Sequence, residues 1–189
     1  MSAFACALFL IAAFVVAGVA QTAWFASPAS ARFALPLDGG VTWRGRRIFG
    51  DNKTLRGIVV MVPAASAAFA LLAASVGDPG AAGLWPLSIG GYALLGAAAG
   101  AGFMAGELPN SFIKRQLGVG PGDLARGRVA AAVQFAIDRV DSGIGMLLAV
   151  SLAVPTPVRT WLLVLAIGPA FHWAFSVLMF QLGLKPRAA

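Results

Sequence analysis

The sequence predicts an all-α, polytopic membrane helix bundle with five transmembrane helices and two cytoplasmic loops, built as a single integral membrane domain over residues 1–189. Hydrophobic residues make up 59% of the chain even with glycine left out of the count, and charged residues only 11%. A soluble domain of this size keeps about a third of its unfolded surface exposed, so it could not bury so large a share of apolar side chains away from water. Five largely apolar stretches of bilayer-crossing length, with cations clustered between them, complete the prediction.

The predicted spans, in chain order, are residues 2–25, 57–76, 84–105, 130–154 and 160–182. The first is expected to be a span and not a cleaved signal peptide, because no Lys or Arg precedes Arg32. The fourth differs from the others: Asp138, Arg139 and Asp141 lie in its N-terminal half, and its uninterrupted apolar part begins only at Ser142. Carboxylates on a helix that enters a membrane are costly and therefore point to a function.

The distribution of cations predicts the orientation. The first connection carries Arg32, Arg44, Arg46, Arg47, Lys53 and Arg56, and the third carries Lys114, Arg115, Arg126, Arg128 and Arg139. The other two connections contain one cation, Arg159. Because short loops rich in Lys and Arg stay in the cytoplasm, we expect a protein of the cell inner membrane with its N-terminus outside and its C-terminal tail, with Lys185 and Arg187, inside. Loops facing anionic headgroups account for the net charge of +7, so we expect no nucleic-acid partner.

Small residues and aromatic residues indicate how the spans pack. The glycine pairs Gly96/Gly100 and Gly102/Gly106 would let the third span approach its neighbours closely. Tryptophans near span ends are typical of an aromatic belt at the membrane surface; they are Trp24, Trp85 and Trp161. His172, near the middle of the last span, is either a functional residue or a neutral histidine hydrogen-bonded inside the bundle.

The first basic loop has features that a topology signal does not need. Between Trp43 and Gly57 it mixes cations with glycines and hydrogen-bonding side chains, among them Gly45, Gly50 and Asn52. Glycine lets a backbone approach a ligand closely, and Arg and Lys bind phosphate as a fork and as a point charge. We expect this loop to bind phosphate; the alternative is a purely topological role.

Two further polar groups lie where spans meet the same side of the membrane. If the third helix continues through Pro109, one face carries an acid, an amide, a hydroxyl and two cations; these are Glu107, Asn110, Ser111, Lys114 and Arg115. On the fourth span, Asp138 and Asp141 are three residues apart and converge. Paired carboxylates need a cation, either Mg²⁺ completed by water and substrate phosphates or the neighbouring Lys and Arg side chains.

These residues resemble a known family. The run Ser111-Phe-Ile-Lys114-Arg115, followed by Asp138-Arg139-Val140-Asp141, is similar to the two-part signature of phosphatidate cytidylyltransferases (CDP-diacylglycerol synthases), S-x-x-K-R and then D-R-x-D. The loop 45–57 and the run from Gly106-Glu-Leu to Arg115 resemble more closely the archaeal CDP-archaeol synthases and their bacterial relatives, small five-span enzymes. The chain departs from them at Glu107, where archaeal members usually have Asp.

The resemblance implies a Mg²⁺-dependent transfer of a cytidylyl group from CTP to a membrane lipid phosphate, giving a lipid of the CDP-archaeol or CDP-diacylglycerol type and pyrophosphate. Asp138 and Asp141 would hold the metal, with Glu107 as a further candidate ligand, and would form the catalytic set with Lys114 and Arg115. Phosphates would be bound and positioned by Arg46, Arg47, Asn52, Lys53, Thr54, Asn110 and Ser111. The alternative is a non-catalytic small membrane transporter or a scaffold for anionic lipids, which explains the basic loops but not the aspartate pair.

Overall fold

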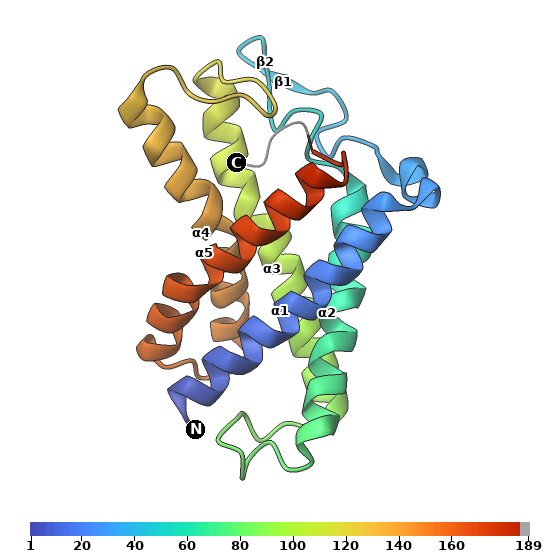
Figure 1. The fold of residues 1–189 in the computed structure, drawn as a ribbon, viewed down its shortest axis with the longest axis vertical. Coiled ribbons are helices and arrows are strands. Elements are labelled where there is room, and N and C mark those ends of the chain that lie inside the picture. The colour runs from blue at the N-terminus through green and yellow to red at the C-terminus, as the bar shows by residue number, and fades with distance from the viewer. Residues whose placement is uncertain (186–189) are drawn as a thin grey trace.

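The computed structural model describes residues 1–185, so the expected position of Arg187 lies outside the described residues. Five long helices account for most of this part of the chain: α1 (Ala3–Ala26), α2 (Leu55–Val76), α3 (Ile89–Gln116), α4 (Arg128–Ala153) and α5 (Val158–Gln181). Each helix packs against the next along the chain, and α5 packs against α1, so the helices form a closed ring (Figure 1). The predicted all-helical bundle is confirmed in this architecture.

Four of these helices are candidate membrane spans by length and composition. Within residues 1–185, α1, α2, α3 and α5 are long and apolar enough to cross a bilayer. Helix α4 is as long, but every stretch of 18 residues in it contains Asp138, Arg139 and Asp141. Whether α4, the fourth predicted span, crosses the membrane therefore stays a prediction. The reason is the group of charges that already distinguishes this span in the sequence.

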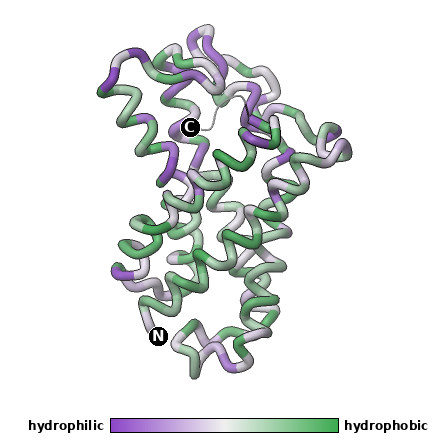
Figure 2. Tube along the Cα trace, viewed as in Figure 1, coloured by the Kyte–Doolittle hydropathy of each residue, from purple (hydrophilic) through white to green (hydrophobic). Residues whose placement is uncertain are grey.

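The two ends of the bundle differ in polarity. The N-terminus lies at one end with the short α2–α3 and α4–α5 connections, whereas residues 27–54, the α3–α4 connection and the end of α5 lie at the other (Figure 1). Hydrophilic residues gather at this second end (Figure 2), which we call the polar end. The two basic loops thus share one end of the molecule, as the sequence predicts.

Helix α3 begins later and runs further than the predicted third span. Pro86 follows Trp85 before the helix, and Ser88 caps its first turn by accepting a hydrogen bond from the Gly91 amide at 3.1 Å. At the other end the helix continues through Pro109 to Gln116. Proline inside a membrane helix is tolerated because neighbouring helices stabilise the freed backbone. The polar stripe of residues 107–115 is therefore part of one continuous helix.

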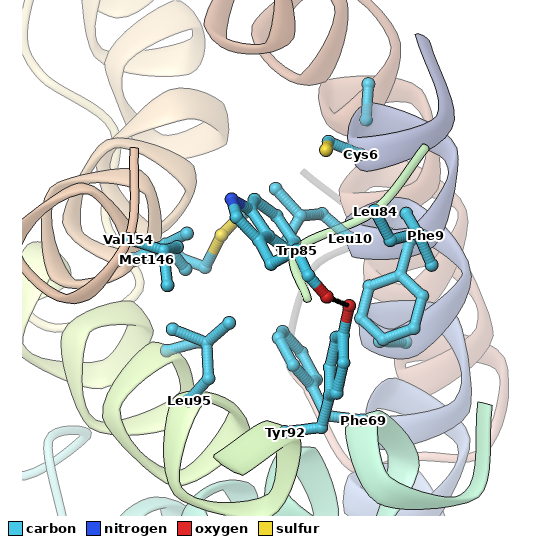
Figure 3. Close-up of a cluster of buried hydrophobic side chains, with 14 of the residues drawn as sticks. Cys6, Phe9, Leu10, Phe69, Leu84, Trp85, Tyr92, Leu95, Met146 and Val154 are labelled. Carbon is cyan, nitrogen blue, oxygen red and sulfur yellow. Dashed lines mark hydrogen bonds between the residues drawn. The ribbon is translucent and has the colours of Figure 1, made fainter. Parts of the chain in front are cut away.

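A buried aromatic cluster fixes the end of the bundle opposite to the polar end (Figure 3). Phe9 of α1 packs edge-on against Phe69 of α2, with ring centroids 5.2 Å apart. Trp85 is only 1% exposed, and its carbonyl accepts a hydrogen bond of 2.6 Å from the Tyr92 hydroxyl. Its indole N–H donates to the carbonyl of Pro155 at 2.8 Å. The expectation that Trp85 belongs to a membrane-surface belt is wrong, because this side chain is buried inside the bundle as part of the core.

The first basic loop contains the remaining regular structure. A 3₁₀ helix, η1 (Pro28–Phe33), is followed by a short antiparallel hairpin of β1 (Thr42–Trp43) and β2 (Arg46–Arg47). Arg44 and Gly45 connect the two strands, and both have positive φ, 52° and 76°, which is the pattern of a tight type I′ turn. Gly45 therefore serves the turn, and not the close approach to a ligand that its place in the loop suggests.

Candidate active site

A cavity of about 640 Å³ opens among the helices and the polar-end loops. It follows α1 from Leu10 to Phe25, a rise of about 22 Å along a helix. Its deeper walls are apolar, with Phe14, Phe103 and Met61 among them. At its polar end it is lined by most of the predicted site residues, namely Asn52, Lys53, Thr54, Glu107, Asn110, Ser111, Lys114, Arg115, Asp138 and Asp141.

Small residues bring the two acid-bearing helices together. A Cβ atom on Gly106 of α3 would lie 2.4 Å from the carbonyl oxygen of Asp141, and one on Gly145 of α4 would lie 2.2 Å from that of Gly102. No side chain fits at such distances, so the backbones touch. Gly96 and Gly100 do the same toward α2, where their Cβ atoms would lie 2.5 and 2.9 Å from backbone oxygens. The predicted role of these glycines is confirmed, and it places α3 directly against α4 at the site.

The aspartate pair is held by side chains of α3. The amide nitrogen Nδ2 of Asn110 donates to Asp138 Oδ1 at 2.6 Å and to Asp141 Oδ2 at 2.7 Å. Lys114 Nζ lies 2.6 Å from the same oxygen of Asp138. Asp141 also accepts a hydrogen bond of 2.6 Å from the backbone amide of Ser142. One carboxylate oxygen of each aspartate thus faces a shared point.

Glu107 belongs to a second ion pair one turn away. Its carboxylate pairs with Lys53 from the first loop and accepts a hydrogen bond of 2.9 Å from the Ser142 hydroxyl. Burial alone would lower the pKa of Lys53, but the adjacent Glu107 carboxylate more than offsets burial, so this pKa is raised and the lysine stays charged. Lys53 and Glu107 are far apart in the sequence, and this pair ties the loop to α3.

A residue that the sequence analysis missed organises the first loop. The Asp38 side chain is fully buried and accepts hydrogen bonds from the amides of Phe49 at 2.9 Å and Gly50 at 3.0 Å. Arg47 donates to both of its oxygens. The Arg47 guanidinium and these amides hold the pKa of Asp38 well below its usual range. The signal in the sequence is the run Asp38-Gly39-Gly40, because Asp before glycine is typical of a turn that the carboxylate itself stabilises.

The structure does not bring every predicted residue into the cavity. Arg47 pairs with Asp38 and Asp51, and Arg46 donates to the backbone carbonyl of Gln116; neither lines the cavity. Arg115 does line it and is only 7% exposed, with its guanidinium beside Gly50. Its Nε and Nη1 atoms have no hydrogen-bond partner within residues 1–185, so this guanidinium has N–H groups available to bind an anion.

The aspartate pair fits a Mg²⁺ ion. Among residues 1–185 no group of three or more His, Cys, Asp or Glu side chains is arranged to hold a metal, and Glu107 is directed to Lys53 and Ser142. Asp138 and Asp141, however, already converge on one donor. Mg²⁺ is commonly bound by one or two carboxylates plus water and substrate phosphates, which is the donor set that this site offers.

The fold and the site define a helical membrane protein with an acidic and cationic cluster at the mouth of a deep, largely apolar cavity. A family model described as CarS-like, CDP-archaeol synthase, matches residues 9–187. The chain belongs to the CDP-archaeol synthase family.

Relatives and a solved structure agree with this assignment. CDP-archaeol synthases of Methanopyrus kandleri and Halorubrum lacusprofundi are 36% and 34% identical to the chain; each alignment covers 79% of the chain, and 77% and 81% of the relative. That of Thermococcus onnurineus is 32% identical over 85% of the chain and 86% of its own length. The chain is also similar to the solved structure of an intramembrane enzyme for archaeal membrane lipid biosynthesis, with a TM-score of 0.59, 27% identity, and coverage of 85% and 90% of the two chains.

Proposed function

We propose that this protein transfers a cytidylyl group from CTP to the phosphate of a membrane lipid, releasing pyrophosphate and a CDP-activated lipid, with Mg²⁺ as cofactor. The observation that carries the proposal is the lining of the cavity, which is charged at one end and apolar at the other. This lining includes five carboxylates and six Lys or Arg side chains, and the deeper walls of the cavity are apolar. Such a cavity suits a substrate pair in which one partner is a nucleoside triphosphate and the other has a phosphate on a hydrocarbon body.

In this reaction an oxygen of the lipid phosphate attacks the α-phosphorus of CTP, the bond from that phosphorus to the β-phosphate oxygen breaks, and pyrophosphate leaves. No general base is needed, because a phosphate monoester with a second pKa of about 6 is already ionised near neutral pH. The contribution of the protein is therefore alignment and charge neutralisation. Lys53 from the first loop and Lys114 and Arg115 from α3 supply cations at the mouth.

Asp138 and Asp141 are the residues that would hold Mg²⁺, which supplies charge neutralisation at the triphosphate when bound. Asn110 keeps the two carboxylates converged, since its amide contacts both of them. Ser111 and Thr54 line the same mouth and can donate hydrogen bonds to phosphate oxygens. We place this mouth on the cytoplasmic side of the inner membrane, because the cationic loops gather at the polar end (Figure 2).

The test is cytidylyl transfer by purified protein, with labelled CTP and either archaeol phosphate or phosphatidic acid. We expect a labelled CDP-lipid and pyrophosphate in equal amounts with Mg²⁺, and none after chelation with EDTA. Asp138→Asn and Asp141→Asn should each lower the rate by about 100-fold or more, as removal of groups that stabilise transition-state charge does.

Asp78→Asn is the matched control, because Asp78 lies in the α2–α3 connection at the opposite end of the bundle. Its side chain accepts a hydrogen bond from the Ala81 amide at 3.0 Å, which an asparagine oxygen can also accept. This variant should keep the wild-type rate. Near-wild-type transfer by both Asp138→Asn and Asp141→Asn would show that the aspartates only balance the charge of Lys114.

A further inference from the structure

The cavity has a second polar wall, on α5, that the proposed chemistry does not use. His172 and Ser176 are one helical turn apart, lie on one face of α5 and line the cavity among apolar neighbours such as Phe171 and Phe175. The Nδ1 atom of His172 is buried and has no hydrogen-bond partner within residues 1–185. This is not the hydrogen-bonded packing histidine that was one of the two interpretations of the sequence.

The chain after α5 folds back and adds a cation to this wall. Gly183 has a φ of +69°, which lets the helix end in a tight turn. The amides of Leu184 and Lys185 then bond back to the carbonyl of Met179, at 2.8 and 3.3 Å. Lys185 consequently points along the helix and not away from it, and its Nζ donates to the Ser176 hydroxyl at 3.2 Å. A lysine at a helix end usually extends to water, so this arrangement is specific.

The charge of this wall differs from that of the α3–α4 wall. Among the described residues, Lys53 and Lys114 pair with Glu107 and Asp138, whereas Lys185, like Arg115, forms no ion pair. Helix α5, unlike α3 and α4, carries no Asp or Glu. Burial lowers the pKa of Lys185, and attraction to Glu107 and Asp138, neither of which forms an ion pair with it, only partly offsets burial. A half-buried cation and an unpartnered histidine nitrogen in one cavity are stabilised when an anion binds between them.

We propose that His172, Ser176 and Lys185 form the subsite for the phosphate of the acceptor lipid, separate from the residues at the α3–α4 wall that receive the triphosphate. The inference rests on the proposed function. A metal-bound triphosphate suits the wall that has carboxylates. A lipid phosphate carries its hydrocarbon with it and suits the wall on which His172, Ser176 and Lys185 lie near apolar side chains of α5, including Phe171 and Phe175.

The test separates the two substrates kinetically. Lys185→Met keeps most of the length of the side chain and removes the charged nitrogen, and His172→Leu removes the ring nitrogens. Each should raise the KM for a racemic dioctylglycerol phosphate at least tenfold, while the KM for CTP stays within twofold of wild type. Lys185→Arg should recover most of the affinity for the lipid. Arg128→Met is the control, because Arg128 is exposed, begins α4 and does not line the cavity; it should leave both KM values unchanged.

Direct binding without CTP makes the result independent of turnover. Wild-type protein in detergent should bind dioctylglycerol phosphate more tightly than dioctylglycerol, and Lys185→Met should remove this difference. An unchanged lipid KM in both variants, or a rise in the KM for CTP instead, would overturn the subsite. If wild-type protein forms no CDP-lipid at all, the proposed function fails, whereas the phosphate-dependent binding and its loss in Lys185→Met still decide the subsite.

Discussion

Asp38 shows how one side chain determines the form of the first basic loop. Replacing it with asparagine removes the charge that Arg47 and two backbone amides bind. We expect Asp38→Asn to lower stability by about 1.5–3 kcal/mol, the range for hydrogen bonds to a charged group, seen as a lower thermal midpoint in detergent and faster cleavage of the loop by trypsin. Asp51→Asn removes the other, exposed partner of Arg47 and should cost no more than about 0.5 kcal/mol.

The same carboxylate gives a pH dependence of known sign. Its pKa is lower in the folded protein than the ordinary value of 3.8, so its contribution is complete above that pH and is lost as the pH falls toward the folded-state pKa. The thermal midpoint of wild type minus that of Asp38→Asn should therefore shrink as the pH is lowered from 5 to 2. A difference that stays constant over this range would mean that Asp38 acts through its shape and not its charge.

At the scale of elements, the contact between α3 and α4 positions the site. A Cβ on Gly145 would lie 2.2 Å from the Gly102 carbonyl oxygen and 2.6 Å from the Cα of Gly106, so Gly145→Ala must push the helices apart. We expect a loss of about 1–3 kcal/mol from this overpacking and at least a tenfold lower transfer rate, because Asn110 would then no longer reach both aspartates. Both are measured on purified protein, as a thermal midpoint and a rate.

Gly90→Ala is the control for this prediction, since the nearest atom to its Cβ is 3.9 Å away and Gly90 lies in the first turns of α3, outside the cavity. It should leave rate and stability unchanged or slightly raise stability, as alanine favours helix over glycine. If Gly145→Ala had the same transfer rate and thermal midpoint as Gly90→Ala, the α3–α4 interface would accommodate the added methyl group without displacing the site residues.

The extent to which the sequence predicts these elements follows from how local each signal is. Helix positions come from runs of apolar residues, which are local, and α1, α2 and α5 agree with their predicted spans within two residues at each end. The convergence of Asp138 and Asp141 is also local, since both lie on one helix. The Lys53–Glu107 pair and the fold-back of Lys185 depend on tertiary packing and on one turn after α5, so periodicity could not show them.

At the scale of the whole molecule, the distribution of charge has a topological consequence. The polar end holds both basic loops and the end of α5 (Figures 1 and 2), while the opposite end holds the N-terminus and two short connections. Because short loops rich in Lys and Arg stay in the cytoplasm, we expect the polar end to face the cytoplasm. This orientation is required by the proposed reaction as well, because CTP is made in the cytoplasm and must reach Lys53, Lys114 and Arg115 from that side.

Reporter fusions test this orientation directly. Fusions after Ala31 and after Arg128, both at the polar end, should report the cytoplasm, and a fusion after Pro79, in the α2–α3 connection, should report the outside. The pair at the polar end also tests whether the first basic loop and the α3–α4 connection lie on the same side of the membrane. An outside signal from only one of the polar-end fusions would mean that Asp138 and Lys53 lie on opposite sides, and a shared active site would then be impossible. Outside signals from both would reverse the proposed orientation.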